Sequence, residues 1–334
     1  MKAIITNKEI LQKKFNGRFS EIENKLVEYS KIFNGKIFYT DKTKSDDIKK
    51  FIDNIDNTEK VNSFLIVGGD DVIPFFKLKN PAGDDGDEIV YSDNPYASKD
   101  NDYFIPERCL GRIPDGNNAE FLISILENFI GVKKDRRKGK FGYTAFEWIK
   151  ASKEVYKAIN GRTLKISPPV KSNNVETKWL NKKKFFYFNL HGSEETKYWY
   201  GQKGENYPVA FSPENLNDVN CNNAVIFSEA CYGANIINKS ASDAISLKFL
   251  ERKAICVVAS TKIAYGPSEP PSTDADLLGK LFFKNVINKE SFGIALMKAK
   301  QNFVVESSKK GYLDATEKKT LIEFVLYGDP DLKI

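Results

Sequence analysis

The sequence predicts an α/β protein in which a mostly parallel sheet is covered by helices on both faces. Short apolar and aromatic runs recur along the chain, and several are continuously apolar, as is typical of strands buried on both faces. Longer stretches with the apolar spacing of helices separate these runs. Strands that alternate with helices form βαβ units, which place parallel strands side by side in one sheet.

The amino-terminal part of the chain contains the first of these elements. The run SFLIV is a clear strand signal because its apolar residues follow one another without interruption. The helical stretches are assigned from apolar spacing close to 3.6 residues. The expected strands are Lys2–Thr6, Lys36–Thr40 and Ser63–Val67, and the expected helices are Asp46–Ile55 and Ala119–Val132.

The carboxyl-terminal part repeats the alternation with stronger signals. The runs FFYFNL, AVIF and AICVVA are almost entirely apolar or aromatic and indicate strands in the middle of a sheet. The expected strands are Phe141–Thr144, Phe185–Leu190, Ala224–Ser228 and Ala254–Ala259. The expected helices are Lys153–Asn160, Asp243–Glu251, Ala275–Asn288, Phe292–Lys309 and Thr316–Leu326.

The composition excludes several classes of protein. With 334 residues, of which 41% are hydrophobic, the chain can bury a sizeable core, which excludes wholesale disorder. The net charge of +6 is diffuse and does not indicate a nucleic-acid partner. No stretch approaches the ~20 apolar residues of a membrane span, so no membrane partner is expected. The sequence does not say whether the protein is a monomer or an oligomer.

The cysteine and histidine contents narrow the chemistry further. Cys109, Cys221, Cys231 and Cys256 include no CxxC pair, so a zinc ribbon is excluded. His191 is the only histidine, which excludes histidine-rich metal sites. Because no signal segment is visible, we expect a cytoplasmic location in which the cysteines stay free.

A dense charge run divides the chain into two parts. Residues 133–140 read KKDRRKGK and lie between an expected helix and an expected strand. We take them as a linker between an amino-terminal α/β subdomain, 1–137, and a catalytic subdomain, 138–334. The run is either a solvated loop or a processing loop that a peptidase specific for basic residues could cut. The residues of this processing loop are Lys133, Lys134, Arg136, Arg137 and Lys138.

An acidic stretch, Asn80–Asp102, is the other loop-rich region. Its carboxylates could hold a calcium ion, but the spacing of an EF-hand is absent, and the composition favours a plain acidic turn region. The candidate ligands are Asp84, Asp85, Asp100 and Asp102. No cofactor is required by any pattern in the sequence.

Two expected strands end at residues with catalytic potential. His191 and Gly192 follow the strand FFYFNL, and Cys231 follows AVIFSEA within a turn of small residues. Active sites of open α/β sheets lie at the carboxyl ends of parallel strands. The 40 residues between His191 and Cys231 suffice for one crossover, so the two strands can be neighbours.

A cysteine beside a histidine is the arrangement that nucleophilic catalysis needs. The thiolate attacks a carbonyl carbon, and the histidine then protonates the leaving amine. Backbone N–H groups of Gly192 and Cys231 are placed to stabilise the oxyanion, because glycine permits close approach of the substrate.

At these residues the sequence resembles the caspase-like (clan CD) cysteine peptidases, and among them the gingipain family, C25. The resemblance includes His-Gly after one strand and Glu229-Ala230-Cys231 after the next. Further landmarks occur in family order from about residue 63 to the end of the chain. They are Phe64–Asp70 with Ile73-Pro74, Asn101–Tyr103, Gly111–Pro114, Val258–Thr261 and Leu326–Leu332.

The resemblance implies a caspase-like α/β/α sandwich in two side-by-side halves and a cysteine endopeptidase acting on peptides or proteins. His191 would be the general acid and base, and Cys231 the nucleophile. A third, acidic residue orients the histidine in gingipains, and the matching segment Phe141–Glu147 makes Glu147 the candidate. Cleavage after Arg or Lys is expected if the pocket is acidic. The candidate pocket residues are Tyr265, Glu269, Asp274, Glu154 and Glu229.

Other readings of the same fold remain open at this point. A transpeptidase would capture the acyl-enzyme with an amine, and an inactive interaction module would keep the fold without the chemistry. Nucleotide binding is disfavoured, because neither GxxxxGK[ST] nor GxGxxG occurs. The absence of GxSxG likewise disfavours a serine hydrolase.

Overall fold

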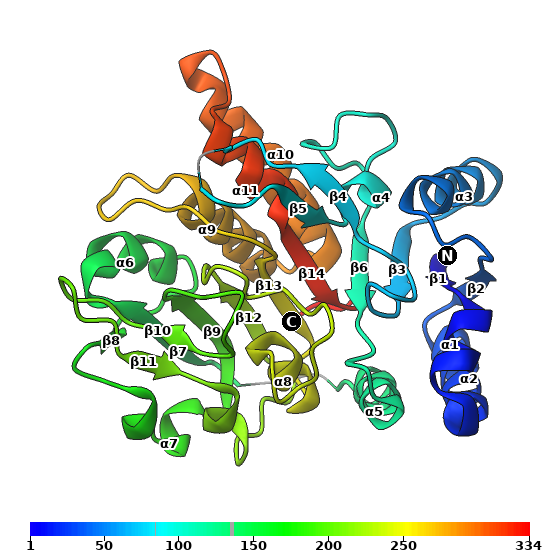
Figure 1. Ribbon diagram of the computed structural model, residues 1–334, viewed down its shortest axis with the longest axis horizontal. Helices are drawn as coiled ribbons and strands as arrows, with labels where there is room; N and C mark the ends of the chain where they lie inside the picture. Colours follow the sequence, from blue (N-terminus) through cyan, green and yellow to red (C-terminus); the bar gives the residue numbers. More distant parts are fainter. Residues whose placement is uncertain (84, 134–136) are drawn as a thin grey trace.

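The computed structural model describes residues 1–83, 85–133 and 137–334, which form an α/β fold around one long sheet (Figure 1). In the described residues this sheet has ten strands in the order β2-β1-β3-β6-β14-β13-β12-β9-β7-β8. Their bounds are β1 Lys2–Thr6, β2 Gly35–Tyr39, β3 Ser63–Val67, β6 Leu110–Ile113, β7 Gly139–Ala145, β8 Lys165–Ser167, β9 Lys183–Asn189, β12 Val225–Ser228, β13 Cys256–Ser260 and β14 Phe324–Gly328.

The sheet is mostly parallel, as predicted. β1 pairs in parallel with β2 and β3, and β3 with β6. On the other side, β7, β8, β9, β12 and β13 form parallel pairs with their neighbours. β14 is antiparallel to β13 and meets β6 at Tyr327 and Arg112, so it joins the two sides of the sheet. Figure 1 shows β1–β3 at one end of the sheet and β7–β9 at the other.

Helices cover both faces of the sheet. Alternate side chains of β9 establish this, since successive residues of a strand point to opposite faces. Phe186 packs against Phe249 of α8, whereas Phe185 and Tyr187 pack against Phe283 of α9. The helices are α1 Lys8–Lys14, α2 Phe19–Ile32, α3 Ser45–Thr58, α4 Asn94–Ala97, α5 Ala119–Ile130, α6 Ile149–Lys157, α7 Thr177–Leu180, α8 Ile245–Glu251, α9 Asp274–Ile287, α10 Phe292–Ser307 and α11 Ala315–Glu323.

Two short hairpins lie outside the main sheet. β4 (Phe76–Lys79) and β5 (Ile89–Ser92) are antiparallel and carry the acidic loop between them. β10 (Trp199–Tyr200) and β11 (Val209–Phe211) form the second hairpin, which follows β9. Both hairpins matter for the site, because their loops reach toward the ends of β9 and β13.

Most of the expected elements are present with ends displaced by a few residues, but one prediction is wrong in kind. The helix expected at Thr316–Leu326 ends at Glu323, and Phe324 begins β14. Apart from Glu323, the run LIEFVLY is apolar or aromatic, so its periodicity does not mark where helix becomes strand. β6 and α2 were not predicted. In the described ranges, none of the helices combines the length and apolar character that a membrane crossing requires.

A buried ion pair joins the start of β1 to the segment that follows β14. The ammonium group of Lys2, at the start of β1, lies 2.6 Å from the carboxylate of Asp329, which follows β14. The hydroxyl of Tyr29 donates to the same carboxylate. Because all three side chains are almost fully buried, loss of one would leave an unpaired polar group in the interior.

Candidate active site

The strands β9 and β12 bring His191 and Cys231 to one cavity. These strands are parallel neighbours, with Ser228 opposite Phe188, so the segments that follow them emerge at the same edge. The two residues line a cavity of about 220 Å³. The sequence prediction that these strands are adjacent is therefore confirmed. The other lining residues are Trp148, Asn189, Leu190, Glu229, Ile263, Ala264, Tyr265, Gly266 and Pro267.

Gly192 allows the histidine segment to lie directly on the cysteine segment. A Cβ atom built on Gly192 would overlap the backbone oxygen of Cys231. Any larger residue would therefore push the two segments apart. The N–H of Gly192 hydrogen-bonds to the sulfur of Cys231, whereas in the described part of the chain the N–H of Cys231 donates to no backbone carbonyl.

The thiol of Cys231 lies in a tight turn at the end of β12. Tyr232, the next residue, has a φ of 56°, a left-handed conformation that non-glycine residues seldom adopt. The sulfur accepts a hydrogen bond of 3.3 Å from the N–H of Ala264, in the loop after β13. Burial raises the pKa of this thiol to about 11, although the Ala264 and Gly192 N–H groups oppose the shift. The resting thiol is therefore protonated near neutral pH.

The imidazole of His191 is held between two aromatic rings. Its centroid lies 4.4 Å from that of Trp148 and 5.2 Å from that of Tyr207. The ring nitrogen Nε2 lies 2.8 Å from Oε1 of Gln202, in the loop between β10 and β11. Burial lowers the pKa of His191, and the hydrogen bond to Gln202 offsets this in part. The histidine is therefore neutral near pH 7 and can accept a proton.

The side chain of Glu147 does not hydrogen-bond to the imidazole of His191 but to the loop that carries Gln202. This exposed side chain accepts a hydrogen bond of 2.7 Å from the N–H of Gly204, whereas the side chain that hydrogen-bonds the imidazole is Gln202. Glu147 was predicted to orient the histidine, but it makes no direct contact with the ring, and Trp148, the next residue, packs against it. The sequence analysis missed both Gln202 and Trp148.

One buried carboxyl group lines the cavity, and a second lies directly behind its wall. Glu229, two residues before the cysteine, lines it directly. Asp276, in the first turn of α9, lies beneath Gly266, where a Cβ atom would come 2.6 Å from its Oδ2 atom. Among the described residues, no group hydrogen-bonds to any of their four carboxyl oxygens. Burial raises the pKa of both groups, with a further rise from Asp276 at Glu229 and from Asp274 at Asp276.

The other predicted pocket residues fall into two groups. Tyr265 and Glu229 line the cavity, and the hydroxyl of Tyr265 donates to Asp85 over 2.8 Å. Glu269 and Glu154 do not line it: each forms an ion pair with a lysine, Lys150 and Lys157 respectively. Asp274 begins α9 two residues before Asp276 and is also absent from the lining. Asp276 was missed because an acidic residue in the first turn of a helix has an ordinary structural explanation.

The predicted calcium ligands are not gathered into one site. Asp84 lies outside the described residues. Asp85 accepts from Lys319 and Tyr265, whereas Asp100 and Asp102 accept from backbone N–H groups in their own turns. Within the ranges that the structure describes, no cluster of three or more acidic, cysteine or histidine side chains has the arrangement of a metal site.

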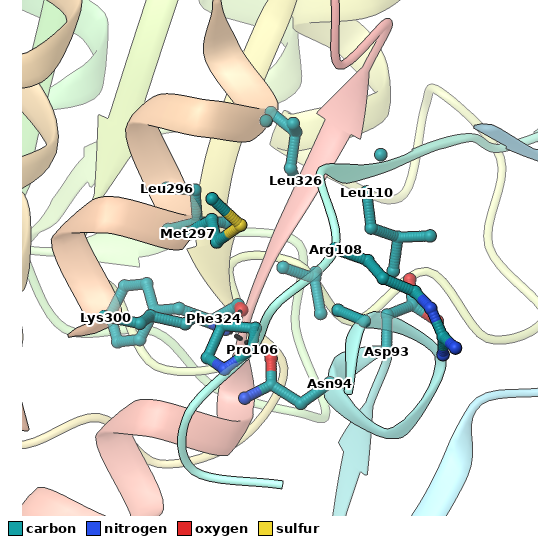
Figure 2. A pocket seen from close by; sticks show the side chains of 14 residues that line it. Asp93, Asn94, Pro106, Arg108, Leu110, Leu296, Met297, Lys300, Phe324 and Leu326 are labelled. Atoms are coloured by element: carbon teal, nitrogen blue, oxygen red, sulfur yellow. Dashed lines mark hydrogen bonds between the residues drawn. The ribbon is translucent and has the colours of Figure 1, made fainter. Parts of the chain in front are cut away.

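A second cavity, of about 30 Å³, lies between β6, β14 and α10 (Figure 2). It has room for about two water molecules, so it cannot hold a peptide. Lys300 of α10 is its most unusual residue, because its buried ammonium group donates to Oδ1 of Asn94 and to the carbonyl oxygen of Phe324, over 2.5 and 2.7 Å. Burial lowers the pKa of Lys300 to about 7.

Lys300 makes the stability of the protein dependent on pH. Between its folded pKa of about 7 and the ordinary lysine value, the unfolded chain binds more protons at this residue than the folded one. The free energy of unfolding therefore rises with pH across this window, by at most ~1.4 kcal/mol per unit. Urea denaturation near pH 7 and pH 8.5 should show a smaller rise for Lys300→Met than for the wild type. Equal slopes would contradict the assignment.

Comparisons with known proteins agree with this arrangement. The model of peptidase family C25 matches residues 10–334. The complex of the pro- and mature domains of RgpB from Porphyromonas gingivalis superposes with a TM-score of 0.73 and 14% identity over 100% of this chain and 79% of that chain. A structure described as a protease gives a TM-score of 0.67 and 13% identity over 100% and 78%. The search of curated protein sequences finds no match. The predicted gingipain-like fold is confirmed.

Proposed function

The chain belongs to peptidase family C25 and is therefore a cysteine peptidase, and from this we propose that it is an endopeptidase with a Cys231–His191 dyad. The observation that carries the proposal is the cavity that both residues line at the ends of adjacent strands. The other three cysteines are buried in the core and line no part of this cavity.

The protonation states of the two residues fit this chemistry. A protonated thiol lies in the same cavity as a neutral imidazole, so the imidazole can take the thiol proton as sulfur attacks the carbonyl carbon of the substrate. The C–N bond then breaks, and the imidazolium gives its proton to the leaving amine. Water, deprotonated by His191, hydrolyses the thioester and releases the acid and the thiol.

The backbone around the cysteine can stabilise the tetrahedral intermediate. The segments that carry the N–H groups of Gly192 and Cys231 are close together, because Gly192 packs on the Cys231 backbone. In the described residues the Cys231 N–H donates to no backbone carbonyl, and the Gly192 N–H lies beside the sulfur that attacks the substrate. Two such donors form an oxyanion hole, which typically contributes ~3 kcal/mol or more to the rate.

We propose that the residue on the acyl side of the cleaved bond is Arg or Lys. Glu229 and Asp276 are buried, and among the described residues neither carboxyl group forms an ion pair, which is costly unless a cation is bound or a proton is taken up. A basic side chain entering the cavity would supply that cation, and Tyr265 offers it an aromatic wall. The test is the cleavage of fluorogenic peptides that vary only at this position, by the wild type and by Cys231→Ala.

Self-cleavage in the 133–140 segment follows from the same specificity. Lys133 and Lys138 are exposed, and Arg137 is half-buried. Lys134 and Arg136 lie outside the described residues. We expect purified wild-type protein to yield two unequal fragments on a denaturing gel, with new ends after a basic residue in this segment, and Cys231→Ala to remain whole. A fully active enzyme that stays whole would contradict self-processing.

A further inference from the structure

The His191 imidazole contacts a neutral amide where a carboxylate was expected. Resting on the proposed dyad, we infer that Gln202 is the positioning residue of the catalytic histidine: it holds the ring and fixes the tautomer with the proton on Nε2. The 2.8 Å contact between Nε2 and Oε1 is the observation that starts the argument.

The orientation of the Gln202 amide is determined by its other contacts. Its Nε2 group donates to the hydroxyl of Tyr207 over 2.8 Å and to the carbonyl oxygen of Gly204 over 3.3 Å. The carbonyl oxygen of the amide must then face the imidazole. Since an amide oxygen only accepts, the histidine nitrogen facing it carries the proton. The lone pair of the neutral ring is therefore on Nδ1, which is the nitrogen that can take the proton of Cys231.

The loop that carries Gln202 is anchored on both sides. The N–H of Gln202 donates to the carbonyl oxygen of Ser167, and the N–H of Gly201 donates to that of Pro208. Gly204 is in turn held by the Glu147 carboxylate, which accepts from its N–H. Glu147 thus acts on the histidine through Gly204 and Gln202 rather than by direct contact.

Tilted aromatic contacts complete the restraint on the ring. Trp148 and Tyr207 lie against the imidazole, and the backbone of His191 exchanges two hydrogen bonds with Tyr200 in the same hairpin. A ring held in this way can rotate only by breaking its contact with Gln202. The Gln202 amide therefore fixes the direction in which Nδ1 of His191 points, and it does so without placing a charge beside the ring.

The use of an amide has a consequence for pH dependence. Burial and Gln202 are the influences on the pKa of His191. The titratable groups around the ring are Tyr207, whose ring lies tilted against it, and Cys231, Glu229 and Tyr265, which line the same cavity. A carboxylate in place of the Gln202 amide would stabilise the imidazolium and raise its pKa by ~1–2 units.

The test compares three variants of the full chain by steady-state kinetics over a pH series. Gln202→Leu removes the hydrogen bond and is expected to lower kcat roughly 10- to 100-fold with little change in KM. Gln202→Glu restores an acceptor, so it should recover much of kcat while the acid limb of the kcat/KM profile moves up by ~1–2 pH units. The control is Gln301→Leu, which removes an amide on α10 that donates to the carbonyl oxygen of Pro106. This variant should behave as the wild type.

The outcomes separate this inference from the proposed function. Wild-type kcat and an unmoved acid limb in both Gln202 variants would overturn the positioning role, while loss of activity in Cys231→Ala would still support the dyad. If Gln202→Leu fails to fold, the Gln202→Glu profile decides alone: an unmoved acid limb overturns the inference. Activity that persists in Cys231→Ala would overturn the proposed function itself.

Discussion

Replacing Cys231 with alanine is expected to lower kcat/KM for every peptide substrate roughly 10⁴- to 10⁶-fold, because the covalent step loses its nucleophile. The fold should be retained, since the side chain is only partly buried and adjoins an open cavity. The matched control is Cys221→Ala, which also replaces a cysteine with alanine. Cys221 is 0% exposed and does not line the cavity. We expect that variant to keep its kcat/KM.

Alkylation provides an independent measurement of the same assignment. Cys109, Cys221 and Cys256 are 4%, 0% and 0% exposed, and burial raises the pKa of each. Iodoacetamide should therefore modify Cys231 first, and the loss of activity should follow that modification. Inactivation that tracks another cysteine, or an active Cys231→Ala protein, would refute the nucleophile.

His191→Ala should show a loss of similar size for a different reason. The thiol of Cys231, with its pKa raised to about 11, is protonated near neutral pH and needs a proton acceptor. His191 is the only histidine in the chain, so no second imidazole can replace it. Alkylation of Cys231 in this variant should also slow, which a change confined to substrate binding would not cause.

The candidate site could be predicted only where residue type and position in a strand coincide. Cys231 and His191 each follow a continuously apolar strand, and the carboxyl edge of a parallel sheet is where such residues meet. Gln202 follows no such strand. It lies in an irregular hairpin loop whose path depends on contacts with Ser167 and Pro208 rather than on a local pattern. No local spacing relates Gln202 to the histidine that it contacts.

The fold shows the same division between local and non-local information. The helix α2 was missed although its buried residues Phe19, Ile22, Leu26 and Tyr29 have helical spacing, so that signal was available. The strand β14 had no such signal: Phe324–Gly328 is buried throughout and directly continues the helix α11 without an intervening turn. Its place between β6 and β13 depends on long-range pairing.

The same limit explains why the sequence analysis missed Asp276. We expect Asp276 and Glu229 together to have a large effect on specificity. Glu229→Gln and Asp276→Asn should each lower kcat/KM for peptides with Arg or Lys on the acyl side of the bond roughly 10²- to 10³-fold. Removing one partner of a buried charge pair costs ~2–5 kcal/mol, and each ~1.4 kcal/mol is tenfold. Peptides with a neutral residue at this position should be cleaved at nearly unchanged rates.

The pair also predicts how binding depends on pH. Burial and neighbouring carboxylates, Asp276 for Glu229 and Asp274 for Asp276, raise the pKa of both groups, so the empty pocket holds protons that a basic side chain must displace. Raising the pH removes those protons, and KM for an arginine peptide should therefore fall between about pH 6 and about pH 9. The glutamine and asparagine variants should show a weaker fall, because fewer carboxyl groups titrate.

A control carboxylate distinguishes this pocket from general surface charge. Glu269 is exposed and pairs with Lys150, so Glu269→Gln changes the net charge by the same amount as Glu229→Gln without altering the cavity. A preference for basic residues that survives Glu229→Gln and Asp276→Asn, or that falls equally in Glu269→Gln, would contradict the assignment. Selective loss in the two buried variants would mean that unpartnered carboxyl groups, rather than the charge of the whole protein, select the substrate.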